Sequence, residues 1–253
     1  MYLIRRIILI AVPALWILFL ELIKNNHNLL WWLMILFLLY LVFAVWSIGR
    51  GKFSKIFFQF LILPILFSIA SFVFVLFLVN AYAFHFFVVI SGLIIYFLLN
   101  QYFIYVNFPY KYQPYSLESL SFYIDLILFY FVLSASFAAR LLLKINPFLL
   151  IAIIVPIFAL ALYNFFWIHK VNFKKSWLYI LIIILTLVEL WIAVVYLPTS
   201  YYVDAFVLIV ASYVMLGISR GFIQKNLSRK RVISYLSVAS LLILIILLTA
   251  KWS

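Results

Sequence analysis

The chain has 253 residues, of which 71% are apolar and only 9% are charged, whereas a soluble globular domain is roughly half apolar and a quarter charged. This composition excludes a soluble globular protein. Its 18 Lys and Arg against 5 Asp and Glu give a formal net charge of +13, which membrane orientation and anionic lipid headgroups explain without nucleic acid. The absence of cysteine excludes disulfides, thiolate metal sites and cysteine nucleophiles.

Long apolar segments follow one another along the whole chain, with short polar connections between them. A membrane-spanning helix needs about 20 mainly apolar residues, so the sequence predicts an all-α, polytopic transmembrane helix bundle of about nine spans. We expect a single helical domain over residues 1–253, with no soluble domain. The expected spans are Leu3–Ile23, Leu29–Ile48, Ile56–Val79, Ala83–Val106, Leu117–Ala139, Ile145–Ile168, Ser176–Leu197, Tyr202–Ile218 and Val232–Ala250.

The first apolar segment follows Arg5 and Arg6 and has the charge pattern of a secretory signal. No small-x-small cleavage site comes after it, because Glu21 and Lys24 stand there instead. We therefore expect an uncleaved first span.

Basic residues predict the orientation, because cytoplasmic connections carry an excess of Lys and Arg. With nine spans and the N-terminus inside, 14 of the 18 bases fall on the cytoplasmic side. The four others are Lys24, Arg140, Lys144 and Lys251. The sequence thus predicts a multi-pass protein of the cell (plasma) membrane with its N-terminus inside and its C-terminus outside.

The most basic connection runs from Ser219 to Arg231. We expect it to orient the protein and to bind anionic lipid headgroups at the membrane surface. The residues expected to do so are Arg220, Lys225, Arg229, Lys230 and Arg231.

Motifs of known chemistry are absent from the chain. It has no phosphate-binding loop, no GxSxG, no HExxH and no paired-carboxylate run. The three histidines, His27, His85 and His169, are far apart in the sequence, so no metal site is expected. No cofactor is expected either, and the missing motifs favour a non-catalytic protein.

Glu189 is the main candidate for a functional residue, because a carboxylate inside a span needs a polar environment. At 100° per residue, Glu189 shares a helix face with Thr186 and Tyr196. We expect this face to point into the bundle and Glu189 to pair with Arg140, directly or through Tyr196 or water. Further members of an expected outer cluster are Asp204 and His85.

A second candidate group lies nearer the expected cytoplasmic side. Asp125 falls about two turns into the fifth expected span, and Asn100 and Gln101 lie at a similar depth in the fourth. The two amides can pair with Asp125 or hold neighbouring helices together.

The last third of the chain resembles a known sequence pattern. The segment LVELWIAVVYLPTSYY from Leu187 to Tyr202, then Gly217, then LSRKRVISY from Leu227 to Tyr235, resembles a pattern in an uncharacterised family of multi-pass membrane proteins of small-genome bacteria. The resemblance implies a bacterial plasma-membrane location. It implies no activity.

Three functions remain open. The first is a non-catalytic membrane subunit or scaffold, with a membrane protein as a possible partner. The second is a small secondary transporter in which Glu189 or Asp125 is the coupling carboxylate, although only five glycines argue against the broken helices of such carriers. The third is a membrane-embedded enzyme acting on a lipid-linked substrate at the outer face.

Overall fold

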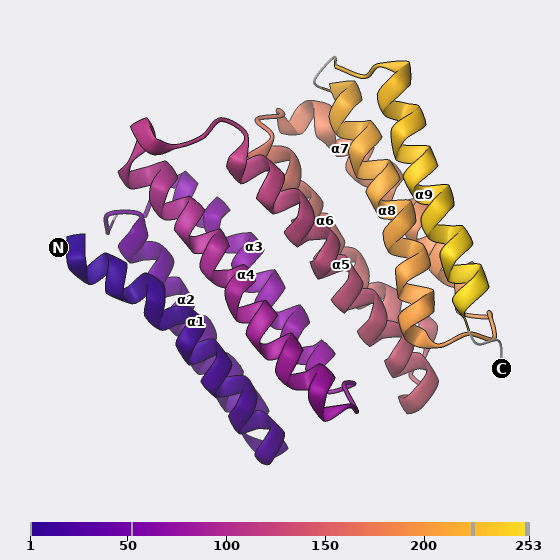
Figure 1. The fold of residues 1–253 in the computed structure, drawn as a ribbon, viewed down its shortest axis with the longest axis horizontal. Helices are drawn as coiled ribbons and strands as arrows, with labels where there is room; N and C mark the ends of the chain where they lie inside the picture. The colour runs from indigo at the N-terminus through magenta and orange to yellow at the C-terminus, as the bar shows by residue number, and fades with distance from the viewer. Residues whose placement is uncertain (1, 52, 224–225, 251–253) are drawn as a thin grey trace. The chain divides into compact units, whose positions relative to one another are not determined.

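The structure is a computed structural model that describes residues 2–51, 53–223 and 226–250. Within these residues the chain forms nine α-helices and two short 3-10 helices (Figure 1). The α-helices are α1 (Tyr2–Asn25), α2 (Leu30–Ile48), α3 (Lys55–Val75), α4 (Ala81–Asn107), α5 (Ser116–Leu143), α6 (Pro147–Ile168), α7 (Phe173–Val194), α8 (Tyr201–Ile223) and α9 (Arg229–Thr249). The 3-10 helices are η1 (His27–Leu29) and η2 (Pro109–Lys111).

Polar residues in the connections begin several helices. Asn80, Asn146 and Asn172 each accept a hydrogen bond from a backbone N–H in the first turn of α4, α6 and α7. Ser54 and Ser228 do the same for α3 and α9. The first N–H groups of a helix have no partner within the helix, so such caps fix where it begins.

Several expected boundaries differ from the structure; α5, for example, ends at Leu143 rather than Ala139. α3 ends at Val75 rather than Val79, because the chain turns there and Asn80 already caps α4. α8 continues to Ile223, beyond the expected end at Ile218. No proline interrupts the residues after Ile218, so the first part of the basic connection is helical.

Eight of the described helices, α1 to α8, are long and apolar enough to cross a membrane. Many large apolar side chains are exposed on them, including Phe97, Leu149 and Leu185. Exposed apolar faces on helices of this length are what a lipid environment requires. The chain is therefore an all-α protein with the helices of a multi-pass membrane protein. A ninth span through α9 stays a prediction.

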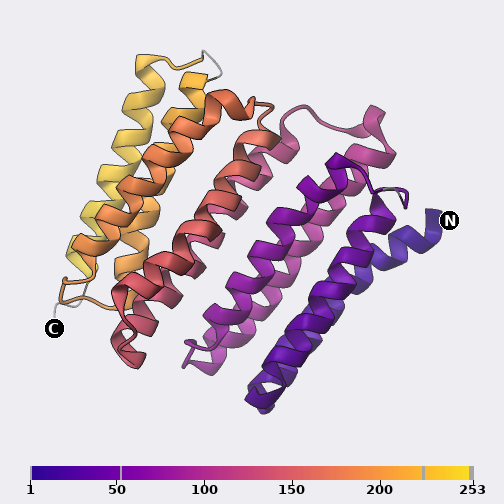
Figure 2. The ribbon, with the colours of Figure 1, turned by 180° about the vertical axis from the view of Figure 1, so that it is seen from behind.

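The chain divides into two compact units, residues 1–125 and 126–253, with the boundary inside α5. The expected single domain stays a prediction. In the first unit α1 packs against α2 and α4, and α2 packs against α3. Figure 2 shows α1 and α2 (indigo and violet) side by side.

The core of the first unit is built around Trp16, which is fully buried. Its ring lies 4.7 Å from Phe37 and 4.9 Å from Phe72 between centroids. Its indole N–H donates to Ser91 Oγ at 2.8 Å. A buried indole needs such a partner, so this bond joins α1 to α4.

The second unit contains the larger part of α5 and helices α6 to α9. α7 packs against α6 and α8, and α9 packs against α8 (Figure 1). Trp191 on α7 stacks on Phe137 of α5 at 5.4 Å between centroids. Phe129 of α5 packs on Phe158 of α6 at 4.4 Å. Aromatic contacts thus hold α5 to its neighbours in this unit.

Candidate functional site

A pocket of about 360 Å³ lies at one end of the second unit. It is formed where α5 and α7 end and α8 begins. Its charged residues are Arg140, Lys144 and Asp204. The remaining lining residues are Phe137, Leu141, Val195, Leu197, Thr199 and Tyr201. The pocket therefore combines two bases and one acid with apolar walls.

The end of α5 positions the two bases. Arg140 lies in the last turn of the helix and donates from Nη1 to the carbonyl oxygen of Ile145 at 3.3 Å. Lys144 follows the helix in a left-handed conformation, with φ 52°. A base near the last carbonyls of a helix is favoured by the helix dipole. This turn holds Arg140 half-buried at the pocket while Lys144 is exposed.

Asp204 lies in the first turn of α8 and is only 6% exposed. Thr199 donates a hydrogen bond from its hydroxyl to Asp204 Oδ1, and the first turn of a helix favours a carboxylate. Among the described residues neither Arg140 nor Lys144 forms an ion pair with this acid. Asp204 is thus held by α8 and the preceding loop, which leaves the two bases facing the pocket.

This pocket is suited to an anionic group attached to an apolar one. A guanidinium and an ammonium are the side chains that bind phosphate and carboxylate groups. Leu141 and Leu197 are 60% and 42% exposed at its wall, which gives an alkyl chain a surface to pack on. The pocket's volume of about 360 Å³ is within the range of small-molecule sites, which begins at about 300 Å³.

Glu189 does not line this pocket, and no direct ion pair joins it to Arg140. Glu189 lies on the exposed side of α7, five residues before the helix ends. Trp191, two residues later, is 2% exposed and faces α5. Since two residues turn a helix by about 200°, the burial of Trp191 directs Glu189 away from the helices that α7 contacts.

Thr186 and Tyr196, which were predicted to share a helix face with Glu189, are not buried either. Tyr196 is 77% exposed. Thr186 is half-exposed, and its hydroxyl donates to the Ile182 carbonyl at 2.9 Å within the same helix. Thr186 and Glu189 therefore lie on a side of α7 that does not point into the bundle, and Tyr196 lies past the end of this helix at Val194, so the predicted face does not extend to it.

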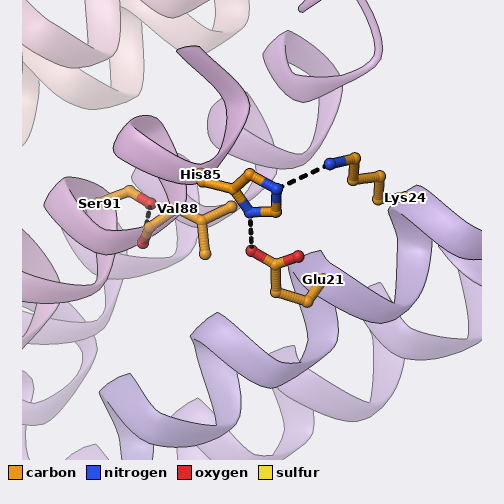
Figure 3. A network of polar contacts seen from close by, with 5 residues as sticks. All are labelled: Glu21, Lys24, His85, Val88 and Ser91. Carbon is orange, nitrogen blue, oxygen red and sulfur yellow. Dashed lines mark hydrogen bonds and ion pairs between the residues drawn. The ribbon is translucent and has the colours of Figure 1, made fainter. Parts of the chain in front are cut away.

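His85 belongs to a different network, in the first unit (Figure 3). Its Nδ1 lies 2.7 Å from Glu21 Oε1, and its Nε2 lies 2.8 Å from Lys24 Nζ. A neutral imidazole satisfies both contacts, donating to the carboxylate and accepting from the ammonium. Lys24 also lies 5.1 Å from the centroid of the Phe84 ring. No local sequence pattern indicates this network, because His85 lies 61 residues from Lys24.

In the second candidate group neither amide pairs with Asp125, and Gln101 instead holds neighbouring helices together, which was the other predicted arrangement. Gln101 accepts a hydrogen bond from Ser116 at 3.2 Å, which joins α4 to the start of α5. Asn100 is half-buried. Asp125 is 1% exposed, and neither carboxylate oxygen has a hydrogen-bond partner among the described residues. The α4 side chain within electrostatic range of Asp125 is Tyr102, which sequence reasoning missed.

The basic connection is described except for residues 224 and 225, so Lys225 lies outside the described residues. Arg220 is in the last turn of α8. Arg229, Lys230 and Arg231 form the exposed first turn of α9. The start of a helix carries a partial positive charge, so three bases there are electrostatically unfavourable. An anionic membrane surface beside them would offset this repulsion.

Among the described residues, no group of three or more His, Cys, Asp or Glu could hold a metal ion. The fold is that of the class of helical multi-pass membrane proteins. Within this class the chain belongs to the family described as "Protein of unknown function (DUF5656)", whose model matches residues 47–249. No curated protein and no solved structure matches the chain.

Proposed function

We propose that this protein lies in the plasma membrane and binds the phosphate group of an anionic membrane lipid, or of a lipid-linked molecule, in the pocket of the second unit. The observation that carries the proposal is the pairing of Arg140 and Lys144 at one pocket of about 360 Å³. These two bases are among the four that fall outside under an N-in, C-out orientation with nine spans. Bases on that side need a reason other than orientation.

The roles of the lining residues follow from their contacts. Arg140, held by the Ile145 carbonyl, presents its remaining N–H groups to a phosphate, and Lys144 adds a second positive charge. Asp204 is kept in place by Thr199 and limits the net charge of the site. The exposed side chains of Leu141 and Leu197 would pack against the acyl part, which favours a lipid over a soluble anion.

Native mass spectrometry of the protein in a mild detergent tests this proposal. The wild-type chain should retain an anionic phospholipid, and the Arg140→Gln/Lys144→Gln variant should lose it. A matched control, Lys170→Gln/Lys174→Gln, removes two bases where α6 ends and α7 begins, away from the pocket, and should retain the lipid. Retention by both variants would overturn the proposal.

Added inorganic phosphate distinguishes the two sources of the phosphate group. A lipid ligand should resist displacement, because its chains pack on the apolar wall. Displacement at millimolar phosphate would show that the site takes a soluble anion instead.

The orientation has its own test. A reporter that works only in the cytoplasm should be active when fused after Arg229 and inactive when fused after Ser253. An inactive reporter after Arg229 would place Arg140 and Lys144 in the cytoplasm, which this proposal does not allow. Activity at both positions would mean that α9 does not cross the membrane.

A second candidate function is that of a membrane subunit, and the position of Glu189 favours it. A carboxylate on an exposed face of a span has no hydrogen-bond partner in lipid, so a partner helix with a basic or hydroxyl side chain would stabilise it. A photo-crosslinker at Ile192 on the same side of α7 should then capture one stoichiometric membrane protein. The same crosslinker at Phe97 on α4 is the control.

A further inference from the structure

Asp125 is a buried acid that the proposed pocket does not use. It lies on α5, nine residues after Ser116, which is about 13 Å along the helix axis. Its side chain is 1% exposed, and both Oδ1 and Oδ2 lack a hydrogen-bond partner among the described residues. An ionised carboxylate without donors is strongly disfavoured in such surroundings.

Tyr102 on α4 is a second buried polar group of the first unit. It lies within range of the charge that Asp125 would carry, but no hydrogen bond joins the two side chains. Tyr102 is fully buried, and its hydroxyl also lacks a hydrogen-bond partner within the described part of the chain. Its ring stacks on Phe60 of α3 at 4.2 Å between centroids, with 7° between the ring planes. The stacked ring fixes where the hydroxyl can lie.

A third polar group without a described partner belongs to α3, where Gln59 directly precedes Phe60. Gln59 is 4% exposed and leaves its Nε2 without a hydrogen-bond acceptor among the residues that the structure describes. Three helices of the first unit thus carry buried polar atoms of this kind. Such groups are rare in native structures, and each calls for an explanation.

Three of the charged groups at this end, Arg5, Arg50 and Glu118, have other partners. Arg5 donates to Asn107 Oδ1 at 3.2 Å, and Arg50 donates to the Val106 carbonyl at 3.0 Å. Glu118, the other acid of α5, accepts from the Tyr112 hydroxyl at 2.9 Å. No described base forms an ion pair with Asp125. A proton is therefore the cation that can neutralise it.

We infer that Asp125 holds an exchangeable proton inside the first unit, and that its carboxyl group and the Tyr102 hydroxyl together form a proton-binding site. No hydrogen bond joins the two groups directly, so a bridging water would connect the O–H of the protonated carboxyl to the lone pairs of the Tyr102 hydroxyl. The bond lost on release is the O–H bond of Asp125, and the proton leaves to water. This site is independent of the phosphate pocket, whose residues lie in the second unit.

The chain offers a sharp test, because its only aspartates are Asp125 and Asp204. Labelling aspartate with ¹³C at the carboxyl carbon gives two signals, and Asp204→Asn leaves the signal of Asp125 alone. Infrared and solid-state NMR spectra of this variant in lipid bilayers at neutral pH should show a protonated carboxyl. In D₂O its carbonyl band should shift, because the proton exchanges. An ionised carboxylate at neutral pH, or a band that does not shift after prolonged exchange, would overturn the inference.

Tyr102→Phe in the same labelled chain tests the second half of the site. Losing the hydroxyl should move the carbonyl band of Asp125, whereas Tyr40→Phe on α2 should not. An unchanged band in Tyr102→Phe would remove Tyr102 from the site. These spectra do not depend on lipid binding at the pocket, so the two proposals fail separately.

Discussion

Trp191 donates a hydrogen bond from its indole N–H to Ser136 Oγ at 3.0 Å, and this bond joins α7 to α5. Ser136 itself donates to the Leu133 carbonyl at 2.7 Å. Trp191 lies on the same face of α7 as Ile183 and Leu187, and all three side chains are buried. It therefore fixes the rotation of α7, which leaves Glu189 on the exposed side.

Ser136→Ala should lower the free energy of unfolding by about 1–3 kcal/mol, the usual cost of leaving a buried donor without its acceptor. The change strands the indole N–H of Trp191, which is 2% exposed. Thermal unfolding in detergent measures the effect. Ser71→Ala is a matched control, because Ser71 is fully buried and its hydroxyl has no partner among the described residues. An equal loss in both variants would contradict the assigned role of the bond.

Gly217→Ala should destabilise the contact between α8 and α9. A Cβ added at Gly217 would come within 2.5 Å of Cε1 in the ring of Tyr235, so the helices or the ring must move. Overpacking of this kind costs about 1–3 kcal/mol. Protease digestion from the C-terminal side should become faster in this variant. Adding Tyr235→Leu, which makes room, should restore resistance, and failure to do so would argue against a steric cause.

The sequence could predict the class of fold, because apolar segments of spanning length and polar breakers are local features. Asn146 and Asn172 cap helices close to the expected boundaries for this reason. The rotation of each helix could not be predicted. Polarity predicts an inward position for Glu189, but the larger apolar face around Trp191 determines which side is buried.

Pairs of residues far apart in the sequence could be predicted only in part. Arg140 and Asp204, expected in one outer cluster, do lie at one pocket, where α5 ends and α8 begins. His85, expected near them, contacts Glu21 and Lys24 instead. A single sequence indicates how deep in the membrane a residue lies. It does not indicate which residue of another helix lies beside it.

Tyr112 should make stability depend on pH only in strongly alkaline solution. Burial raises the pKa of Tyr112, and its hydrogen bond to Glu118 raises this pKa further. A raised pKa means that folding favours the protonated phenol. The stabilisation is therefore complete below about pH 10, the ordinary value for tyrosine, and is lost as pH rises through the folded-state pKa.

Thermal unfolding from neutral to alkaline pH, in the wild type and in Tyr112→Phe, measures this contribution. The stability difference between the two should be constant near neutrality and should shrink above about pH 10. Tyr110→Phe, at a 78% exposed position, is the control. A difference that instead shrinks as the pH falls from neutral would contradict the assignment.

A peptide covering Ser219 to Arg231 should bind anionic lipid vesicles, with about 1 kcal/mol for each base near the surface. Replacing Arg229, Lys230 and Arg231 by Gln should weaken binding, and added salt should weaken it further. Vesicle co-sedimentation measures both effects. Unchanged binding after the substitutions would leave these bases with a role in orientation alone.

The pocket between the ends of α5, α7 and α8 should open outward and bind a lipid phosphate, and cysteine labelling tests both properties at once. The chain contains no cysteine, so a single cysteine at Leu141, on the pocket wall, can be labelled selectively. A membrane-impermeant maleimide added to intact cells should label it. In proteoliposomes an anionic phospholipid should slow the labelling several-fold relative to a neutral glycolipid, and Arg140→Gln/Lys144→Gln should abolish this protection. A cysteine at Tyr196, exposed outside the pocket, should be labelled without protection. Equal labelling of Leu141→Cys in both lipids, or labelling only after the cells are opened, would contradict the account.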